Sequence, residues 1–589
     1  MSINNILNTA KLGLFANQGA LRVVSHNVSN VSTPGYSRQT AVMVANPGLQ
    51  RGGDGKSAGD GVHIEQVKQQ LDNLMDRRLQ GGEAELGRLE GRDRFMNMIE
   101  NVFNELDGDG LSTRLEKLFT SIDLLTDNPT DAVVRDQVME NAGATSGFIK
   151  RMYNGLSELT LPVDKEITVT LDDINSRLKS IRDVNLAIVR QDATPAKALD
   201  LKDQRRQMVM ELGKIVDIQT IDQGDGGVSI LTANGIMLMD HTYAATLSRG
   251  PGSATQNTPQ TIRVDERTGD LTSEIKSGTL KGLIEVRDQV INGDSGFLSK
   301  LETLADEMRW RFNRVHSQSV PGGLLQSRTG AIDLGQNLTT AMSGLVTDTT
   351  QSTYVGSPVD LSRVVNGTLS FAYGADPNGT LTQANVPITT GMSINDVVTA
   401  INANAGAGVT ASVSGNRLVL TGTGGNSFGV VSDASGVLAA LGVGAFFTGS
   451  GAASMGVDAA MQAKPALLGT GRFITTGATP VHNDANNEGA MLLGDLRTEK
   501  FTLFGESATL ISHYGTIAGN LGSEQSRNQA EMTSIQSSQG FMRDLRDSVS
   551  GVSLEEEMTD MIKFQRAFQA SSKMVSTADN LFETLIQMV

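Results

Sequence analysis

The stretch INNILNTAKLGLFANQGALRVVSHNVSNV, residues 3–31, decides the expected fold. Its apolar residues recur at alternating spacings of four and three, a 3.5-residue period that keeps one helix face against a partner helix. Only Asn17 departs from the repeat. The other positions are Ile3, Leu7, Ala10, Leu14, Leu21, Val24, Val28 and Val31. We expect a coiled-coil helix that stops at Thr33-Pro34-Gly35, because proline disfavours helix at the preceding residue and Gly35 suits a type II turn.

Residues 554–589 show the same period, and eight of its eleven positions are apolar. These eight are Leu554, Met558, Met561, Phe568, Val575, Phe582, Ile586 and Val589. Ser553 and Glu556 have the spacing of a capping box at the start of this helix.

The two ends carry opposite charge. No acidic residue precedes Asp54, whereas residues 553–589 contain six acidic and three basic residues. We therefore expect the terminal helices to pair, to be poorly ordered in the monomer and to fold together when copies of the chain assemble, since short helices gain most of their stability from packing. The alternative is that both are amphipathic helices packed on a globular core of their own chain.

Composition limits the possible functions. A chain of 589 residues suggests roughly three to five domains. The net charge of -16 argues against a nucleic-acid partner, because phosphate binding needs clustered lysine and arginine. Cysteine is absent, which excludes disulfides, thiolate nucleophiles and cysteine-ligated zinc. We expect no Sec signal at MSINNILNTAKLGLFANQ. We also expect no membrane span, because glycines interrupt the uncharged segment 434–457.

Charge and turn residues divide the rest of the chain. No lysine lies between Lys300 and Lys464, and hairpin signals fill this interval around one expected helix at SINDVVTAINANA. A smaller β segment, residues 215–271, contains a hairpin at Asn234-Gly235. The remaining segments have helical periodicity, with a break at Asn128-Pro129-Thr130 where Thr130 or Asp131 could cap the next helix.

The sequence therefore predicts a multidomain α+β fold, with long α-helical coiled-coil terminal and rod domains and inserted β-rich outer domains. The expected domains are a terminal coiled-coil core (1–36 with 553–589), a helical rod (37–214 with 272–320 and 458–552), a small β domain (215–271) and a β-rich variable outer domain (321–457).

Three patterns suggest chemistry, and none is convincing. Gly425-Asn426-Ser427-Phe428-Gly429, followed by Asp433 or Asp458 and then His482, matches a hydrolase nucleophile elbow. In a glycine-rich chain such a match arises by chance, and it lies between two β runs rather than between a strand and a helix. The six histidines show neither i, i+4 pairing nor an HExxH motif, so no zinc site is supported.

The third pattern has calcium-loop spacing at Glu105, Asp107, Asp109 and Glu116. We favour a helix–helix turn with Ser112 as N-cap, because the first ligand is glutamate instead of the shorter aspartate. We predict no enzymatic activity, no cofactor and no metal.

Residues 25–39, SHNVSNVSTPGYSRQ, resemble the N-terminal signature of bacterial flagellar axial proteins, which include rod, hook and hook-associated proteins. Two longer segments, residues 103–138 and 550–588, closely resemble the flagellar hook-associated protein 1 family, the FlgK type. The residues that carry the signature are Asn27, Asn30, Thr33, Pro34, Gly35, Tyr36, Phe564 and Gln565. Residues 388–422 are similar to an insert module of flagellins and hook-associated proteins.

This resemblance implies a structural protein of the hook–filament junction. Its copies would form a helical ring between the hook protein and a second junction protein of the FlgL type, and the filament would be built on that ring. The resemblance also implies an extracellular location, export without a cleaved signal peptide through the flagellar type III channel, and an export chaperone of the FlgN type at the C-terminal helix. No nucleic acid and no membrane would be partners.

Two rival functions remain open at this stage. One is a secreted adhesin or hydrolase whose β domain is the active part, which would be expected to carry a Sec signal. The other is a different axial subunit such as the hook protein, which would be expected to lack the long helical region between residues 71 and 214.

Overall fold

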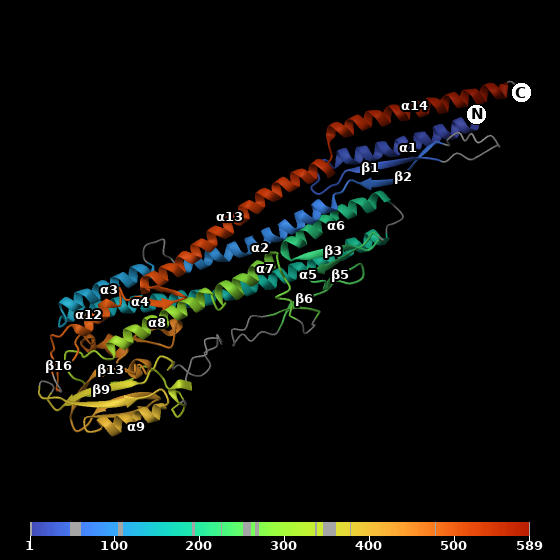
Figure 1. Cartoon of the computed structure of the whole chain (residues 1–589). Coiled ribbons are helices and arrows are strands. Elements are labelled where there is room, and N and C mark those ends of the chain that lie inside the picture. The colour runs from blue at the N-terminus through green and yellow to red at the C-terminus, as the bar shows by residue number, and fades with distance from the viewer. Residues whose placement is uncertain are drawn as a thin grey trace.

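The computed structural model shows an elongated molecule with both chain ends at one tip (Figure 1). It describes residues 3–46, 61–103, 110–190, 195–224, 226–250, 261–265, 270–335, 338–344, 361–376, 379–476 and 479–587. Long helices run along the molecule and small antiparallel sheets lie beside them or at the other tip. The predicted multidomain α+β class is confirmed.

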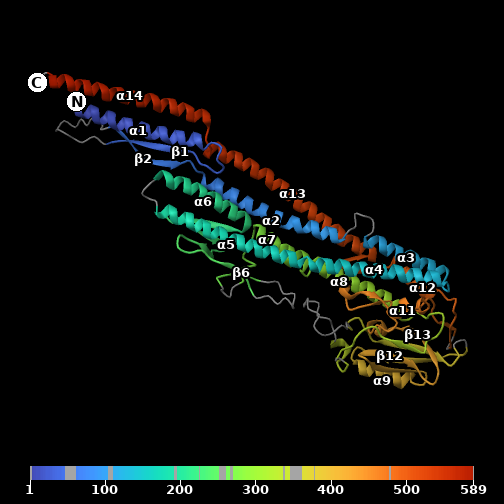
Figure 2. The same ribbon diagram turned by 180° about the vertical axis from the view of Figure 1, so that it is seen from behind.

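The terminal unit, as we call it, consists of α1 (Ile3–Ser29), α14 (Leu554–Gln587) and the antiparallel hairpin β1 (Gln39–Ala45) with β2 (Val62–Gln69). Two views show α1 and α14 side by side (Figure 1, Figure 2). The hairpin packs on α1. The sequence predicted that residues 37–69 belong to the helical rod, and this prediction is wrong. The described residues of this segment form β1 and β2, which pack on the side of α1 that α14 does not cover.

The rod is built from helices that share one large core. They are α2 (Asn73–Phe103), α3 (Leu111–Asp127), α4 (Ala132–Glu158), α5 (Thr160–Arg190), α6 (Pro195–Ile215), α7 (Thr279–Glu285) continuing into a π-helical turn (Val286–Ile291), α8 (Phe297–His316), α12 (Glu488–Asp495) and α13 (Leu510–Ser550). Stacked and edge-on aromatic rings join distant segments, as Phe103 contacts both Phe297 and Tyr514.

Local sequence explains where several of these elements end. Asp131 caps α4, because its carboxylate accepts hydrogen bonds from the backbone N–H groups of Val133 and Val134. At the other predicted turn, Tyr36 N–H donates to Thr33 O at 3.2 Å, and Gly35 has φ +77°, the left-handed value that the third position of a type II turn requires.

The small β segment forms two sheets against the rod. β3 (Ile218–Asp222), β4 (Val228–Thr232) and β5 (Met237–Met239) form one, and β6 (Leu247–Arg249) with β7 (Ile262–Val264) forms the other. The hairpin expected at Asn234-Gly235 is present, with Gly235 at φ +85°. Ile230 and Leu238 belong to the same hydrophobic core as the rod helices, so this segment is part of the rod core and has no core of its own.

The outer domain at the far tip has its own core, which includes Leu369, Phe371, Val386, Ile401 and Leu420. One sheet has the order β10-β9-β13 and the other β11-β12-β8. The elements are β8 (Ser327–Thr329), β9 (Gly367–Gly374), β10 (Thr382–Ile388), α9 (Ile394–Ala405), β11 (Val409–Ser414), β12 (Arg417–Gly422), β13 (Ser427–Asp433) and α10 (Val437–Ala440). The predicted single longer helix is α9, which starts with a capping box between Ser393 and Asp396.

The outer domain ends earlier than predicted. Phe446, Phe447, Met455 and Met461 pack into the rod core, so the domain closes near Val443 instead of Val457. The returning chain forms short elements: β14 (Phe447–Thr448), β15 (Gly456–Val457), α11 (Ala459–Ala463), β16 (Ile474–Thr476), β17 (Thr479–Val481), β18 (Phe501–Leu503) and β19 (Glu506–Ala508), with single 3-10 turns at Ala452–Ser454 and Pro465–Leu467. A further 3-10 turn, Met342–Gly344, belongs to the outer domain.

Candidate functional site

The terminal helices meet through small side chains of α1. Apart from Asn27, the buried positions of α1 are Ala10, Gly13, Ala16, Ala20 and Val24. A Cβ atom on Gly13 would lie 3.1 Å from Ser571 Oγ of α14, so the helices approach closely there. On the hairpin side, a Cβ atom on Gly19 would lie 2.5 Å from Ile64 Cδ1 of β2. Small residues on α1 therefore allow two neighbours to pack on it at once.

The seam residues predicted on α1 flank this contact. Val24 is buried, whereas Leu7, Leu14, Leu21 and Val28 are half-buried. Val31 is exposed and lies beyond the end of α1, and the side chain of Ile3 is outside the described residues. A single apolar stripe with a 3.5-residue period can face one neighbouring element, whereas α1 packs on two. The large apolar side chains of α1 therefore lie at the edges of its contacts, and alanine and glycine occupy the centre of each contact.

Apart from Asp560 and Ala567, the α14 positions that are not exposed recur at spacings of four and three, as a coiled-coil strand requires. They are Glu557, Met561, Phe564, Phe568, Ser571, Val575, Ala578 and Phe582. This set contains Met561, Phe568, Val575 and Phe582 of the predicted seam. Leu554, Met558 and Ile586, also predicted, are 50%, 48% and 73% exposed. The signature residue Gln565 is exposed too.

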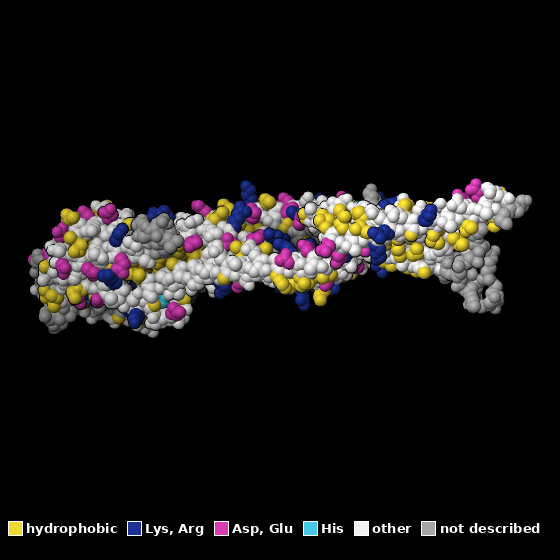
Figure 3. All heavy atoms as spheres, turned by 90° about the horizontal axis from the view of Figure 1, so that it is seen from above, with side chains coloured by type: hydrophobic (Ala, Val, Ile, Leu, Met, Phe, Trp, Pro, Cys, Tyr) yellow, Lys and Arg dark blue, Asp and Glu magenta, His cyan; other side chains and the backbone are white. Residues whose placement is uncertain are grey.

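Several large apolar side chains of α14 remain largely exposed in the described part of the chain. They are Leu554, Met558, Ile562, Met574, Leu581, Leu585 and Ile586, each close to half exposed or more. They do not share one face, because helical spacing puts Met558 and Ile586 on one side of the α1 contact and Met574 and Leu581 on the other, where both line a groove with Ile6 of α1. Figure 3 shows hydrophobic side chains gathered over the terminal part of the molecule and where α13 meets α14. Seven large apolar residues on one helix exceed what a surface helix leaves in water without a partner.

The signature segment forms a joint between α1, β1 and the start of α14. The Asn27 side chain, which is 1% exposed, donates from Nδ2 to Gln39 O at 2.8 Å and to Glu557 Oε2 at 3.0 Å. Its Oδ1 accepts from Tyr36 Oη at 2.8 Å and from Gln39 N–H at 3.0 Å. One amide thus joins α1, the turn, β1 and α14 with all four of its hydrogen bonds satisfied.

Arg38 completes the joint from the other side. Its Nε lies 2.7 Å from Glu557 Oε1, and Nη1 lies 2.5 Å from Glu556 Oε2. Its backbone N–H donates to Ser550 O at 2.9 Å, at the last residue of α13. Burial by itself would lower the pKa of Arg38. The charge of Glu557 and the hydrogen bonds that Arg38 donates to Glu557 and Glu556 instead raise this pKa above its ordinary value.

Two other signature residues act within the turn. Asn30 Nδ2 donates to His26 O at 3.0 Å, and Thr33 Oγ1 donates to Asn30 Oδ1 at 3.2 Å. Tyr36 Oη is 2.9 Å from His26 Nδ1. Burial raises the pKa of Tyr36, and the nearby charges of Asp200, Asp203 and Glu557 raise it further, so this phenol stays protonated and able to donate.

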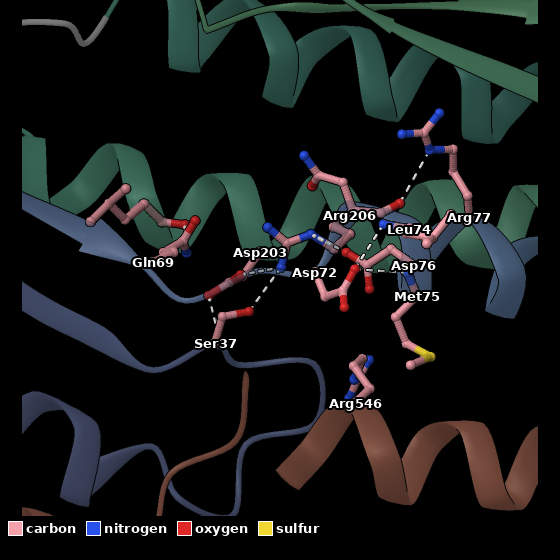
Figure 4. A network of polar contacts seen from close by, with 12 residues as sticks. Ser37, Gln69, Asp72, Leu74, Met75, Asp76, Arg77, Asp203, Arg206 and Arg546 are labelled. Carbon is pink, nitrogen blue, oxygen red and sulfur yellow. Dashed lines mark hydrogen bonds and ion pairs between the residues drawn. The ribbon is translucent and has the colours of Figure 1, made fainter. Parts of the chain in front are cut away.

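A second polar network attaches the joint to the rod (Figure 4). Ser37 N–H donates to Asp203 Oδ2 of α6 at 3.1 Å, and Arg206 Nη1 donates to Ser37 Oγ at 2.9 Å and to Asp203 Oδ1 at 2.8 Å. Arg206 Nε also lies 3.5 Å from Asp76 Oδ2 of α2. Burial raises the pKa of Asp203, although Arg206 and Ser37 act against the rise.

Sequence reasoning missed four of these residues, Arg38, Glu557, Asp203 and Arg206. The only signal in the sequence was the opposite charge of the two chain ends, which does not identify the residues that pair. The predicted capping box is half formed: Glu556 N–H lies 3.5 Å from Ser553 Oγ, while the Glu556 carboxylate binds Arg38.

The structure places the other patterns in structural roles. Ser427 begins strand β13, so the glycine-rich match is not a strand–turn–helix elbow. The Asp433 carboxylate accepts hydrogen bonds from Ser435 Oγ and from the N–H groups of Gly436 and Leu438. His482 Nε2 lies 2.8 Å from Asp484.

The calcium-like loop is only partly visible. Glu105, Asp107 and Asp109 lie outside the described residues, and the Glu116 carboxylate is 2.6 Å from Arg497 Nη2. α3 begins at Leu111 with Gly110 before it, so Ser112 is not the N-cap that we expected. No cluster of three or more histidine, aspartate or glutamate side chains suited to a metal ion occurs among the residues that the structure covers. None of the described helices has the length and apolar character that crossing a bilayer requires.

Comparison with known families identifies three segments. The flagellar hook-associated protein FlgK helical domain matches residues 96–331, the C-terminal domain of flagellar basal body rod FlgEFG proteins matches residues 539–588, and the flagellin hook IN motif matches residues 368–424. The last match covers the segment that resembled an insert module.

Relatives match over the whole chain. Flagellar hook-associated protein 1 of Salmonella typhimurium is 25% identical, and that of Escherichia coli is 26% identical, each with all of both chains covered. The Bacillus subtilis protein is 25% identical and covers 98% of this chain and 97% of its own. In fold, the chain is similar to the flagellar hook junction protein FlgK from Burkholderia pseudomallei, with a TM-score of 0.50 and 14% identity over 80% of this chain and 100% of that one.

The matched helical domain, the matched C-terminal segment and the full-length relatives all point the same way, and the chain belongs to the FlgK-type family of flagellar hook-associated proteins.

Proposed function

We propose that this protein is a structural subunit of the hook–filament junction of the bacterial flagellum, and that its activity is ordered self-assembly on the tip of the hook. The observation that carries the proposal is the set of seven large apolar side chains of α14 that the described part of the chain leaves close to half exposed or more. Burial of about seven large apolar side chains between copies would contribute on the order of 10 kcal/mol before the cost of association is subtracted.

The predicted seam divides into two roles under this proposal. Met561, Phe568, Val575 and Phe582 hold α14 to α1 within one subunit, and Leu554, Met558 and Ile586 contact a neighbouring copy. Under this proposal the contact joins different surfaces of two identical subunits, with these side chains of α14 against another part of the next copy. Contacts of this kind generate rings or helical assemblies instead of closed dimers.

The partners follow from the family to which the chain belongs. We propose that it contacts the hook protein on one side and a second junction protein of the FlgL type on the other, and that an export chaperone of the FlgN type covers α14 before assembly. Export would proceed without a cleaved signal peptide, to the outside of the cell. The relatives are flagellar structural proteins, which supports a non-enzymatic role.

Electron microscopy of a strain that lacks the gene tests the function. We expect hooks without filaments, with filaments restored by a plasmid that supplies the intact chain. Intact filaments on the deletion strain would refute the proposal.

A variant separates assembly from folding. Leu554→Asp with Met558→Asp places two charges at exposed apolar positions of α14 and leaves Met561, Phe568, Val575 and Phe582 unchanged. We expect this variant to be exported and to fail to hold filaments, while Arg566→Asp, a charge change at another exposed position of α14, serves as the control.

A further inference from the structure

The outer domain is connected to the rod by two chain segments that pass through one place. Val320, on the way in, pairs with Gly471, on the returning chain, through backbone hydrogen bonds of 2.8 and 3.1 Å. A domain held only at such an entry point would be expected to change its angle to the rod, because relative motion is the default where the interface between domains is small. A fixed angle requires a second attachment at a distance from the entry point.

The first attachment lies at the entry point itself. Arg328 of β8 donates from Nη1 to Ser317 O and from Nη2 to Ser319 O, both at 3.1 Å. These carbonyls lie just beyond the last residue of α8, where a cation interacts favourably with the helix dipole. On the returning chain, the ring of Phe473 lies 2.8 Å from where a Cβ atom on Gly429 of β13 would be. Both contacts are next to the two linking segments, so by themselves they leave the outer domain free to turn.

A second attachment lies further back along α8. Trp310, the only tryptophan of the chain, belongs to this rod helix but packs against the hydrophobic core of the outer domain. A Cβ atom on Gly436 would lie 3.0 Å from the Trp310 ring, and Gly436 has φ +74°, so close approach and backbone conformation both favour glycine there. Trp310 precedes His316, the last residue of α8, by six positions, which is about 9 Å along a helix.

Arg363 of the outer domain completes the second attachment. Its Nη1 lies 2.7 Å from Glu307 Oε2 and its Nη2 lies 3.0 Å from Asp306 Oδ2, both on α8. The guanidinium carbon is 5.5 Å from the centre of the Trp310 ring, a distance at which a cation is attracted to an aromatic face. The Glu307 side chain is only 10% exposed, so salt and water screen this pair less than they screen a surface ion pair.

The rod orients both carboxylates toward Arg363. Asp306 Oδ1 pairs with Arg309, and Glu307 Oε1 lies 2.6 Å from Arg311 Nε, in each case within α8. Each carboxylate therefore gives one oxygen to an arginine of the rod and the other to Arg363 of the outer domain. Because the rod arginines hold the carboxylates in place, little side-chain freedom is lost when Arg363 binds. Loss of Arg363 would still leave each carboxylate with its partner in the rod.

We propose that Arg363, the two carboxylates that it binds and Trp310 form a latch that holds the outer domain at one fixed angle to α8. The latch consists of Asp306, Glu307, Trp310 and Arg363. Two attachments separated along a helix define an angle, whereas the entry point alone would be a pivot. The outer domain lies beside the end of α8 in both ribbon views (Figure 1, Figure 2).

The latch makes every copy of the chain present its outer domain in the same direction. It is a property of the single subunit and needs no assembly partner, so it stands or falls independently of the proposed junction function.

Distance measurements between spin labels on the full-length chain test the fixed angle. The chain has no cysteine, so labels attach only where cysteine is introduced. Gln137→Cys on α4 with Thr399→Cys on α9 spans the rod and the outer domain. Gln137→Cys with Ser157→Cys, about 30 Å apart on one helix, is the rigid control, and all three positions are exposed. We expect one narrow component for each pair. A broad or divided distribution for the pair that spans the two domains would overturn the proposal.

Charge reversal ties the angle to the latch. Arg363→Glu, added to the pair that spans the two domains, places a third carboxylate against Asp306 and Glu307, and repulsion between like charges should release the domain. We expect the distance distribution to broaden. In the unlabelled chain, the fluorescence emission of Trp310 should move to longer wavelength as water reaches the ring. Arg417→Glu makes the same change at an exposed position of β12 and should alter neither measurement.

Two further variants and a folding control complete the test. Asp306→Arg combined with Arg363→Glu restores opposite charges across the contact and should narrow the distribution again. Arg363→Ser removes the charge without adding another and should broaden the distribution as Arg363→Glu does. Hydrogen exchange in β9, the central strand of its sheet, should stay as slow as in the natural chain, because the latch lies outside the core of the domain. A narrow distribution in both Arg363→Ser and Arg363→Glu would overturn the proposal.

Discussion

Arg38 and Glu557 lie 519 residues apart in the chain, and they meet with Arg38 Nε 2.7 Å from Glu557 Oε1 at the point where the two ends of the protein join. Glu557 is only 1% exposed and Arg38 is 17% exposed at its side chain. An acidic group this deep in the structure depends on its partner, because a buried charge without one is strongly unfavourable.

Arg38→Met should therefore destabilise the terminal unit by about 3 kcal/mol, since it leaves a buried carboxylate without its cation. Hydrogen exchange in the first turns of α14 measures the effect. Arg22→Met, at an exposed position of α1, is the control. Glu557→Gln combined with Arg38→Met should recover part of the loss, and equal protection in all four chains would contradict the assigned role.

Phe568→Asp should prevent junction assembly. Phe568 is half-buried on the side of α14 that carries its least exposed residues, and a carboxylate there removes an apolar contact worth about 2 kcal/mol and adds a desolvation cost. Gln569→Asp, at the neighbouring exposed position, adds the same charge outside the contact. We expect lost motility only in the first variant, with the melting temperature of the rod unchanged in both. Normal motility of Phe568→Asp would argue against the seam.

Limited proteolysis of the dilute monomer should remove residues before about Asp54 and after about Ser550 and leave a stable middle. α1 and α14 cover each other on one face, and α14 keeps large apolar side chains in water, so the terminal unit has little buried area per residue. Mass spectrometry of the products at several protein concentrations measures the effect. Ends that resist protease at the lowest concentration would show a self-contained terminal unit.

His316 should make the stability of the middle of the molecule depend on pH. Burial lowers the pKa of His316 to about 4, against the hydrogen bond to Gly444 O and together with the charge of Arg328. Its Nδ1 donates to Gly444 O at 2.7 Å and its Nε2 accepts from Gly469 N–H at 2.9 Å, so the neutral ring joins α8 to two points of the chain that returns from the outer domain.

The sign follows from proton binding. In the unfolded chain His316 has the ordinary histidine pKa of 6.5, whereas in the folded chain its ring binds a proton only at about pH 4. The contribution of neutral His316 to the free energy of unfolding is complete above pH 6.5. It is lost as pH falls toward 4, by about 3 kcal/mol in total. Across this range the melting temperature should fall more steeply with decreasing pH for the natural chain than for His316→Gln. Equal slopes of melting temperature against pH would contradict the prediction.

The outer domain should be removable without loss of filament attachment. Val320 pairs with Gly471 through two backbone hydrogen bonds, and His316 contacts Gly444, so the chain enters and leaves the domain at one place. We expect a chain that joins Val320 to Gly444 through a short Gly-Ser linker, without residues 321–443, to be exported and to hold filaments.

The boundary chosen for this deletion decides its outcome. A deletion extended to Val457 also removes Phe446 and Phe447 from the rod core and should destabilise the rod. Filaments shed by the shorter deletion would show that the outer domain is part of the junction contact.

The sequence by itself determined the features that depend on near neighbours in the chain. The turn at Thr33-Pro34-Gly35, the helix start after Asn128-Pro129 and the hairpin at Gly235 each follow from a few adjacent residues whose backbone preferences decide the conformation locally. The structure then chose Asp131 over Thr130 as the cap of that helix. The 3.5-residue periods predicted two long terminal helices, and the composition change marked the outer domain.

Only the tertiary structure decided which face of each helix is covered. α1 packs on both α14 and the β1–β2 hairpin, and this places Ala10, Gly13 and Ala20 at the closest contacts and moves the leucines of the repeat to the edges. The partner of Glu557 could not be chosen from sequence, because every basic residue near the N-terminus satisfies the charge rule. The fold is what brings Arg38 within 2.7 Å of Glu557. Contacts between residues hundreds of positions apart depend on how the whole chain closes, and local preferences carry no information about that closure.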